Sequence, residues 1–263
     1  MKRQGSYSDV GSIRVRDGDE IGWVLGASTK STVCFLSNFG RAFTVRVDQL
    51  PSTTGHGSPV QKLFDFVDKE RVVGVVSFDS RTLPRVTADP ELEPELFADG
   101  ESTEETGPCL VAVSSAGLAV RLPIAAYVDT STRSGRKYMR LPEGQVVVRA
   151  DVSGGAENVC LASRSGHALI FPVSQIPVVR TAAKGVIAMR VAKSVDVIGF
   201  VLSSAARQGL EVETTRGRRE IIRPTKFAIA NRGNKGRAII KRGSIQRIIA
   251  ETIEIRLNGA SSS

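Results

Sequence analysis

The sequence predicts an all-β fold in which a unit of about 50 residues is repeated along the chain. Three observations support this prediction. Two glycine positions recur in register, apolar and polar residues alternate over short runs, and Gly, Pro or Asn stand where these runs end. The chain has 263 residues, of which 41% are hydrophobic, so it is long enough to bury a core.

The glycine register is the strongest sign of a repeat. The first glycine of each unit, at the turn of an alternating hairpin, is Gly40, Gly117, Gly166 and Gly217. The second, which follows after 17 to 19 residues, is Gly57, Gly135, Gly185 and Gly236. The intervals between the first glycines are 77, 49 and 51 residues, and the first becomes 50 when the 27 residues 81–107 are removed as an insertion. Two anchors that keep one register indicate a true repeat.

Each unit is predicted to contain four short strands. The hairpin strands are clearest at 210–214 and 219–222, which flank Gly217. A later strand follows the second glycine of each unit, over 71–77, 145–152, 195–202 and 244–250. A single four-stranded sheet cannot bury both of its faces, so neighbouring units must pack radially around an axis. The unit is therefore typical of a propeller-like blade.

The predicted organisation is one domain over residues 1–258 with about five blades. The units span about 1–30, 31–80, 108–155, 156–205 and 206–257. The first is partial, since residues 11–26 match only the second half of a unit, while residues 251–257 form a strand left over at the other end. Together these ends would complete a fifth blade, and four blades plus a fragment is the alternative. Residues 259–263 are predicted to be a disordered tail.

Charge is distributed unevenly along the chain. The net charge is +9, although residues 81–107 contain eight acidic and only two basic residues. Residues 208–250 contain eleven Lys and Arg against three acidic residues. This excess of positive charge suggests a polyanionic partner, usually nucleic acid and less often an anionic membrane, and the alternative is charge that serves solubility.

The acidic segment 81–107 is rich in Pro, Glu, Thr and Gly, which predicts a flexible insertion. In one interpretation it is a surface loop that costs little loop entropy. In the other it mimics nucleic acid and covers the basic surface of the same chain. Deletion of the segment would distinguish these, because only mimicry predicts a change in DNA affinity at low salt.

Cysteine, histidine and hydropathy patterns indicate no catalytic or metal site. The three cysteines, Cys34, Cys109 and Cys160, lack metal-ligand spacing and are expected to be small core residues. His56 and His167 lie beside turn glycines and are expected to be polar turn residues. No acidic cluster for Mg²⁺ and no glycine-rich nucleotide loop followed by a helix is found. A non-catalytic, soluble intracellular protein without a signal peptide or membrane span is predicted.

One short motif links the repeat to a known family. Residues 230–236 read Ala-Asn-Arg-Gly-Asn-Lys-Gly and keep four of the seven residues of the gyrase A-box, namely Arg232, Gly233, Lys235 and Gly236. The leading glutamine and one glycine of the box are absent, and this copy lies in the last unit. Remnants occur at Lys184-Gly185 and at 133–135. Unit by unit, the whole chain resembles the C-terminal domain of the A subunit of bacterial type IIA DNA topoisomerases, the family of DNA gyrase and topoisomerase IV.

The resemblance implies a β-pinwheel, in which each blade lends strands to its neighbour. It also implies sequence-independent binding and bending or wrapping of double-stranded DNA, which is presented to the catalytic core of the A subunit for ATP-dependent topology change together with the B subunit. ATP and Mg²⁺ would be used in other domains or subunits, with no cofactor in this chain. The DNA-cleaving tyrosine lies in a different domain of the family's enzyme, so none of Tyr7, Tyr127 and Tyr138 is assigned that role. A bacterial cytoplasmic, nucleoid-associated location follows, with no membrane partner.

The basic turns suit a phosphate backbone and carry no base code. Gly233 and Gly236 can adopt positive φ and expose backbone N–H groups, while Arg232, Lys235 and Arg237 place cations beside them. Equivalent turns of a ring would lie along one rim, where they would offset the roughly 1–6 kcal/mol needed to bend a short duplex. The predicted DNA-binding residues, in order of priority, are Arg232, Gly233, Lys235, Gly236, Arg237, Lys241 and Arg242, then Arg216, Arg218, Arg219, Arg223 and Lys226, then Arg180 and Lys184, and finally Arg133, Arg136 and Lys137.

Two further functions remain open at this point. The chain is alternatively a stand-alone architectural DNA-binding protein derived from such a domain. It is alternatively a propeller-like protein-interaction scaffold, for which the basic residues are incidental and DNA binding is weak.

Overall fold

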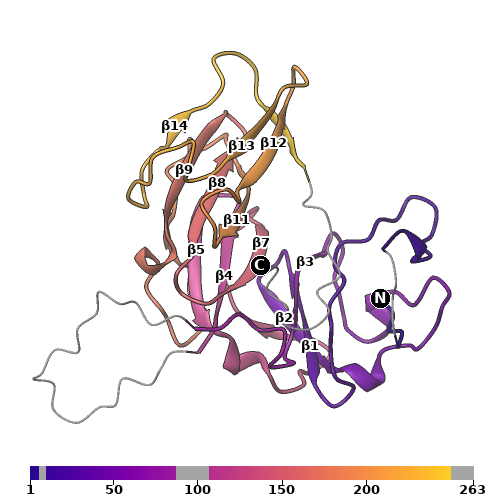
Figure 1. Ribbon diagram of the computed structural model, residues 1–263. Coiled ribbons are helices and arrows are strands. Elements are labelled where there is room, and N and C mark those ends of the chain that lie inside the picture. The colour runs from indigo at the N-terminus through magenta and orange to yellow at the C-terminus, as the bar shows by residue number, and fades with distance from the viewer. Residues whose placement is uncertain (6–9, 87–106, 250–263) are drawn as a thin grey trace, which may run out of the picture. The chain divides into compact units, whose positions relative to one another are not determined.

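The computed structural model describes residues 1–5, 10–86 and 107–249 (Figure 1). These residues form antiparallel β-sheets joined by loops and short 3₁₀ helices, and none of their helices is long and apolar enough to cross a membrane. The chain divides into two compact units. The first contains Met1–Leu83 and Ala126–Tyr138, and the second contains Pro84–Ala125 and Met139–Ala250.

The first unit contains one four-stranded sheet in the order β3-β1-β2-β6. Its strands are β1 (Thr32–Ser37), β2 (Arg41–Arg46), β3 (Val72–Ser77) and β6 (Arg136–Lys137). The associated 3₁₀ helices are η1 (Val10–Ser12), η2 (Val47–Gln49) and η3 (Val60–Lys62), and η4 (Ile124–Tyr127) leads into the unit. Phe43 and Phe64, with ring centroids 5.1 Å apart, lie at the centre of its apolar core.

The second unit contains three sheets, in the orders β10-β5-β4-β7, β11-β8-β9-β14 and β13-β12-β15 (Figure 1). The strands of the first of these are β4 (Cys109–Ser114), β5 (Leu118–Pro123), β7 (Val147–Ser153) and β10 (Val186–Ile187). The next sheet contains β8 (Asn158–Ser163), β9 (His167–Pro172), β11 (Val197–Ser203) and β14 (Arg237–Ala238). The last contains β12 (Leu210–Thr214), β13 (Arg219–Ile222) and β15 (Ile245–Ile248), and η5 (Val173–Gln175) follows β9.

The predicted repeat is confirmed. The first glycines have φ of 72°, 77°, 80° and 75° along the chain, and the second glycines have φ of 81°, 71°, 90° and 80°. The strands predicted over 210–214 and 219–222 are β12 and β13, and the later strands predicted in each unit correspond to β3, β7, β11 and β15. The all-β, pinwheel-like architecture is therefore as the sequence predicts.

The outer strand of a sheet is supplied by the repeat that follows it. β6 pairs with β2, β10 pairs with β5, and β14 pairs with β9. Each of these two-residue strands begins directly after a second glycine, so the turn delivers the chain to the edge of the preceding sheet. Among the described residues, β13 has no such outer strand. This arrangement is the strand lending that the resemblance implies.

The described residues form four sheets, and a fifth blade stays a prediction. Residues 11–26, predicted to form half a unit, contain part of η1 and no strand. Val15, Trp23 and Leu25 in this stretch are exposed. The strand predicted over 251–257, the tail 259–263, residues 87–106 of the acidic insertion and Tyr7 lie outside the described residues.

The middle sheet of the second unit is buried on both faces. Side chains alternate along β8, so Val159 and Leu161 join the core shared with β4 and β5, whereas Cys160 and Ala162 join the core shared with β12 and β15. Each large side chain buried in this way contributes about 1.5–3 kcal/mol. Packing of sheet on sheet, which the period-2 pattern predicts, therefore holds the repeats of this unit together.

All three cysteines are buried and free, as predicted for core residues. Burial raises the pKa of the Cys34 thiol to about 11 and that of Cys160 to about 12, so neither is an activated nucleophile. The three thiols therefore pack in the core.

Asp79 connects two segments of the first unit. Its carboxylate accepts hydrogen bonds from the backbone N–H of Ser28 at 2.8 Å and from the Arg81 guanidinium at 2.6 Å and 2.9 Å. Only 5% of the Asp79 side chain is exposed. The hydrogen bond from Arg81 is the main reason that the pKa of Asp79 lies far below its usual range, while burial opposes the shift.

Asp79→Asn is expected to lower the free energy of unfolding by about 2 kcal/mol at pH 7, because charged hydrogen bonds are lost. The pKa is lower in the folded state, so the ionised carboxylate stabilises the fold fully above its unfolded value near 4, and this contribution is lost as pH falls through the folded value. Urea unfolding of both proteins from pH 7 to pH 2.5 should show the difference narrowing below about pH 4. A difference that does not change with pH would contradict this assignment.

Candidate nucleic-acid interface

The second glycines fix the basic turns of the second unit against a neighbouring sheet. Gly185 has φ +90°, and a Cβ on it would lie 2.3 Å from the carbonyl oxygen of Ala119. Gly236 has φ +80°, and its Cβ would lie 2.4 Å from the carbonyl oxygen of Ala168. Only glycine allows so close an approach at positive φ. Lys184 and Lys235 directly precede these glycines and are exposed. The contact of each glycine with the neighbouring strand therefore fixes where the lysine stands.

Backbone hydrogen bonds place the cations of consecutive repeats next to one another. Arg140 N–H donates to Ala183 O at 2.9 Å, beside Lys184, and Arg190 N–H donates to Asn234 O at 3.0 Å, beside Lys235. We call Arg140, Lys184, Arg190 and Lys235 the cation row. All four side chains are exposed, and none has a hydrogen-bond or ion-pair partner within the described part of the chain. The cation row therefore extends over three repeats, and its charged groups are accessible to a binding partner.

Arg140 and Arg190 are missing from the residues that the sequence predicts. A signal for them exists, since each lies five residues after a second glycine, as does the predicted Lys241. The A-box remnants draw attention to the residues before and directly after the glycine. The residue five positions after a second glycine is recognised as part of a basic surface only from the backbone hydrogen bonds, which place it beside the basic turn of the next repeat.

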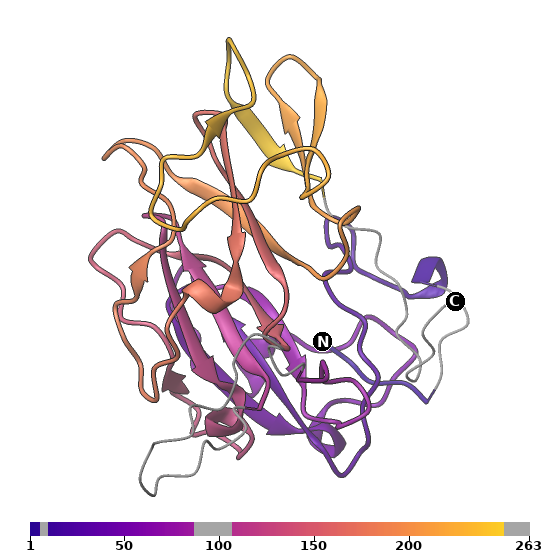
Figure 2. The ribbon, with the colours of Figure 1, turned by 60° about the vertical axis from the view of Figure 1, so that its left-hand side comes forward.

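A second group of exposed cations lies on two adjoining loops of the last repeat. Thr215 N–H donates to Ser244 O at 3.0 Å, which joins the β12–β13 turn to the loop before β15. Arg216, Lys241 and Arg242 are exposed on these loops, and we call them the tip cluster. The loops project side by side at one end of the second unit in both views, as the orange and yellow segments of Figure 2 show.

Other predicted cations of the last repeat are engaged within the protein. Arg218 and Lys226 both form ion pairs with Glu220, which is buried, and the Arg218 contact measures 2.6 Å. Arg223 donates from Nη1 to the carbonyl oxygen of Arg207 at 3.5 Å. These side chains neutralise or hold local groups, so they have less freedom to reach a phosphate.

Arg133 and Arg136 of the first unit also hold local structure. Arg133 pairs with Asp65 at 2.9 Å, and Arg136 donates to the carbonyl oxygens of Ala126 and Thr130 at 3.1 Å and 3.0 Å. The remaining predicted cations are exposed and have no side-chain partner among the residues described here. They are Lys137, Arg180, Arg219 and Arg237.

The A-box-like loop, residues 230–236, is hydrogen-bonded to the preceding repeat through Arg232 and Gly233. Arg232 Nε donates to Gln175 O at 2.6 Å and Nη1 donates to Ile187 O at 3.1 Å. Gly233 has the predicted positive φ, but its N–H donates to Ala188 O at 2.7 Å. The expectation that Gly233 exposes its N–H to phosphate is therefore wrong, because the loop lies against the chain that follows β10.

Two tyrosines and the two histidines lie outside the cation row and the tip cluster. Burial raises the pKa of Tyr127 to about 12, and Tyr138, which is fully buried, donates its hydroxyl to Ser37 O at 2.7 Å. His56 is exposed in a bend, as predicted. His167 lies just after a turn glycine, with Nδ1 3.2 Å from Ser165 Oγ, and burial together with Lys235 lowers its pKa.

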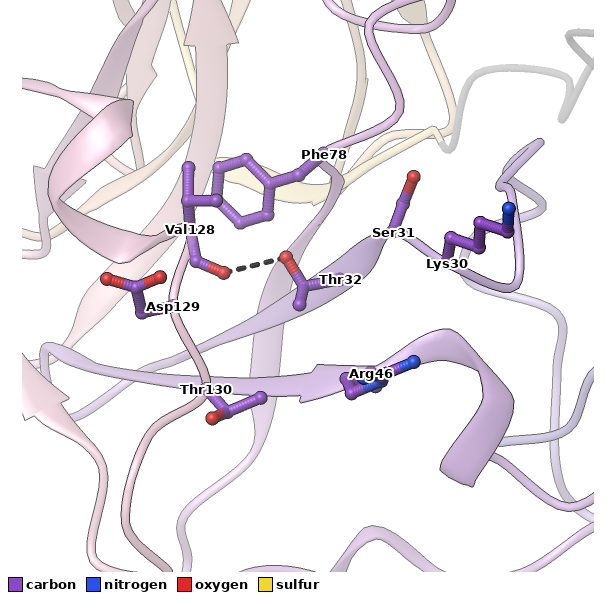
Figure 3. A pocket seen from close by; sticks show the side chains of 8 residues that line it. All are labelled: Lys30, Ser31, Thr32, Arg46, Phe78, Val128, Asp129 and Thr130. Carbon is purple, nitrogen blue, oxygen red and sulfur yellow. Dashed lines mark hydrogen bonds between the residues drawn. The ribbon is translucent and has the colours of Figure 1, made fainter.

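An open hollow of about 530 Å³ lies in the first unit (Figure 3). Thr32 Oγ1 donates to Val128 O at 2.7 Å across one wall, and the Phe78 ring lies above this contact. The other lining residues are Lys30, Ser31, Arg46, Asp129 and Thr130. Its charges are mixed, and Arg46 is paired with Asp48. In the described ranges, no group of three or more His, Cys, Asp or Glu side chains is arranged to hold a metal ion.

Comparison with known proteins identifies a family pattern described as "DNA gyrase C-terminal domain, beta-propeller". It matches residues 31–79, 110–153 and 157–204, which together are more than half of the chain. The matched ranges are the first three complete repeats. The last repeat, which carries the A-box-like loop and the tip cluster, lies beyond them.

Curated relatives include the DNA gyrase A subunit of Pseudomonas aeruginosa, 25% identical over 245 residues that cover 84% of this chain and 26% of that protein. The DNA topoisomerase 4 A subunit of Caulobacter vibrioides is 33% identical over 75 residues, 28% of this chain and 10% of that protein. The chain thus spans about a quarter of the length of the Pseudomonas gyrase protein.

Solved structures with the same fold include a C-terminal domain of DNA topoisomerase IV, with a TM-score of 0.75 and 17% identity over 92% of this chain and 70% of that one. The Escherichia coli ParC C-terminal domain has a TM-score of 0.68 and 18% identity, over 94% of this chain and 93% of that one.

Proposed function

Because this chain belongs to the family of the DNA gyrase C-terminal domain, we propose that it binds double-stranded DNA independently of sequence and bends it. The observation that carries the proposal is the cation row. Its four cations are exposed and have no partner within the described part of the chain. They come from three successive repeats, and backbone hydrogen bonds at Arg140 and Arg190 join each repeat to the next. Cations that contact phosphates, and not base edges, release counterions from the DNA. Such contacts give affinity without sequence preference.

Bending is supported by the repeated construction of the row. A basic residue lies five positions after each second glycine, and a lysine directly precedes Gly185 and Gly236, so successive contacts belong to successive sheets. A duplex that follows them is bent at a cost of about 1–6 kcal/mol over 20–30 base pairs. Several phosphate contacts offset this amount. The tip cluster extends the basic surface at the end of the last repeat.

The place of this activity in a larger reaction is inferred from the relatives. They are A subunits of DNA gyrase and of DNA topoisomerase 4, and this chain corresponds to about a quarter of the Pseudomonas gyrase protein. We infer that the bent DNA is presented to the catalytic core of such an A subunit, which works with a B subunit to change DNA topology. ATP and Mg²⁺ would then act in those other parts.

Two measurements test the proposal. Fluorescence anisotropy with two unrelated duplexes of about 40 base pairs is expected to give equal affinities, and log K should fall with log salt with a slope of about −4 or steeper, from roughly −0.9 per phosphate contact. A lack of binding in low salt would favour the protein-interaction scaffold. Ligation of nicked plasmid in the presence of increasing amounts of the chain then measures the change in linking number. A progressive positive change indicates chiral wrapping. No change despite binding indicates that the chain only holds or bends the DNA.

A further inference from the structure

Arg232 belongs to the A-box-like loop, residues 230–236, and its side chain contacts the preceding repeat. It is partly buried, and two of its donors bond to backbone carbonyl oxygens of Gln175 in η5 and Ile187 in β10. Its own backbone N–H donates to Gln175 Oε1 at 2.7 Å. The side chain that the A-box pattern singles out therefore contacts protein on two elements of another repeat.

Gln175 completes the contact from the other side. Its Oε1 accepts from the Arg232 N–H, and its Nε2 donates to Asn231 Oδ1 at 3.2 Å. Asn231 O in turn accepts from Asn234 Nδ2 at 3.0 Å, which closes the loop on itself. One uncharged side chain thus binds two consecutive residues of the loop.

From these contacts we infer that Arg232 is a positioning residue: together with Gln175 it fixes the loop so that Lys235 and Arg237 face DNA. The inference rests on the proposed function. Lys235 and Arg237 flank Gly236, which lies against Ala168 O, and both are exposed without a side-chain partner in the described part of the chain. Their direction is therefore set by the backbone of the loop, which Arg232 and Gln175 hold.

The chemistry of the contact requires arginine specifically. A planar guanidinium donates in two fixed directions at once, here to carbonyl oxygens of two different elements. A lysine carries the same charge, but its single ammonium does not reproduce this fork. The equivalent positions, four residues before the earlier second glycines, hold Thr53, Ser131 and Thr181, so the last repeat alone has a long side chain at this place.

The first comparison uses variants that leave the net charge unchanged. Arg232→Lys and Gln175→Ala are each expected to weaken duplex binding about 5- to 10-fold, and to reduce the salt slope by about 1–2, since two contacts are misdirected. The double variant should bind the duplex no more weakly than the weaker-binding single variant, because both changes remove the same contact between Arg232 and Gln175. Gln145→Ala is the matched control: this glutamine also bonds a side chain of another loop, Ser115, but lies outside the A-box-like loop. It is expected to bind as the unchanged protein does.

Amide hydrogen exchange at Arg232 and Gly233 provides a readout that does not depend on DNA. Their N–H groups donate to Gln175 Oε1 and Ala188 O, so both are expected to be protected, and to exchange faster in Arg232→Lys and Gln175→Ala at an unchanged melting temperature. Wild-type affinity and slope in Arg232→Lys, with weak binding only in Arg232→Gln, would assign Arg232 to phosphate and overturn the inference. Unchanged exchange in Gln175→Ala would also overturn it. A wild-type chain that binds no duplex would instead overturn the proposed function, whatever the exchange shows.

Discussion

Gly185→Ala is expected to lower the free energy of unfolding by about 3–5 kcal/mol, near the upper end for a single substitution. The new methyl group would lie 2.3 Å from the carbonyl oxygen of Ala119 and 3.0 Å from Val120 Cγ1. The first neighbour is the backbone of Ala119, which pairs with Val113, so it cannot move without disturbing the pairing of β5 with β4. The positive φ adds about 1–2 kcal/mol of strain.

Gly144→Ala separates the two contributions. Gly144 also has positive φ, +74°, but an added Cβ would meet nothing within 4 Å. Its replacement is expected to lower the free energy of unfolding by only about 1–2 kcal/mol, which is the backbone strain alone. Urea unfolding of the two variants measures the difference. Equal losses would show that the turn does not need to lie against the neighbouring sheet.

Replacement of all four residues of the cation row by glutamine is expected to weaken duplex binding by about 100- to 1000-fold near 0.1 M salt. Each phosphate contact contributes roughly 0.9 to the salt slope, so the slope should fall by about 3–4. The side chains are exposed and make no described hydrogen bonds, so stability should change little. Titrations of a labelled duplex over a series of salt concentrations measure both quantities.

A comparison at equal charge guards against a nonspecific effect of net charge. Lys184→Gln with Lys235→Gln removes two charges from the row, whereas Arg46→Gln with Arg247→Gln removes two charges that are already paired with Asp48 and Glu213. The first pair is expected to weaken binding about 10- to 30-fold and the second less than about 2-fold. Equal weakening would mean that overall charge, and not the row, determines affinity.

The hairpins were predictable because their signal is local. In β12 and β13, alternation and one turn glycine suffice, and the observed bounds equal the predicted ones. The two-residue outer strands β6, β10 and β14 could not be located in this way, since two residues carry no periodicity. That blades lend strands followed from the family resemblance, and the pairings supply the details.

Prediction of the site was limited by contacts that are distant in the sequence. Composition identifies the last repeat as strongly basic, and Lys235 and Arg237 are indeed exposed. Nothing local indicates that Arg232 bonds to Gln175, which precedes it by 57 residues, or that Gly233 faces Ala188. The same limit hid Arg190, whose neighbour Asn234 belongs to the next repeat. Tertiary contacts thus separate cations that are available from those that are engaged.

The origin of the outer strands has a consequence for the order in which the protein matures on the ribosome. β9 is synthesised well before β14, and β5 well before β10, so an emerging sheet keeps one bare edge until the following repeat has left the exit tunnel. Maturation is therefore vectorial, and each repeat acts as the closing element of the one before it. For the same reason a repeat cannot be excised as a module: deletion of the last one would remove β14 and leave the β9 edge open to pairing with another molecule.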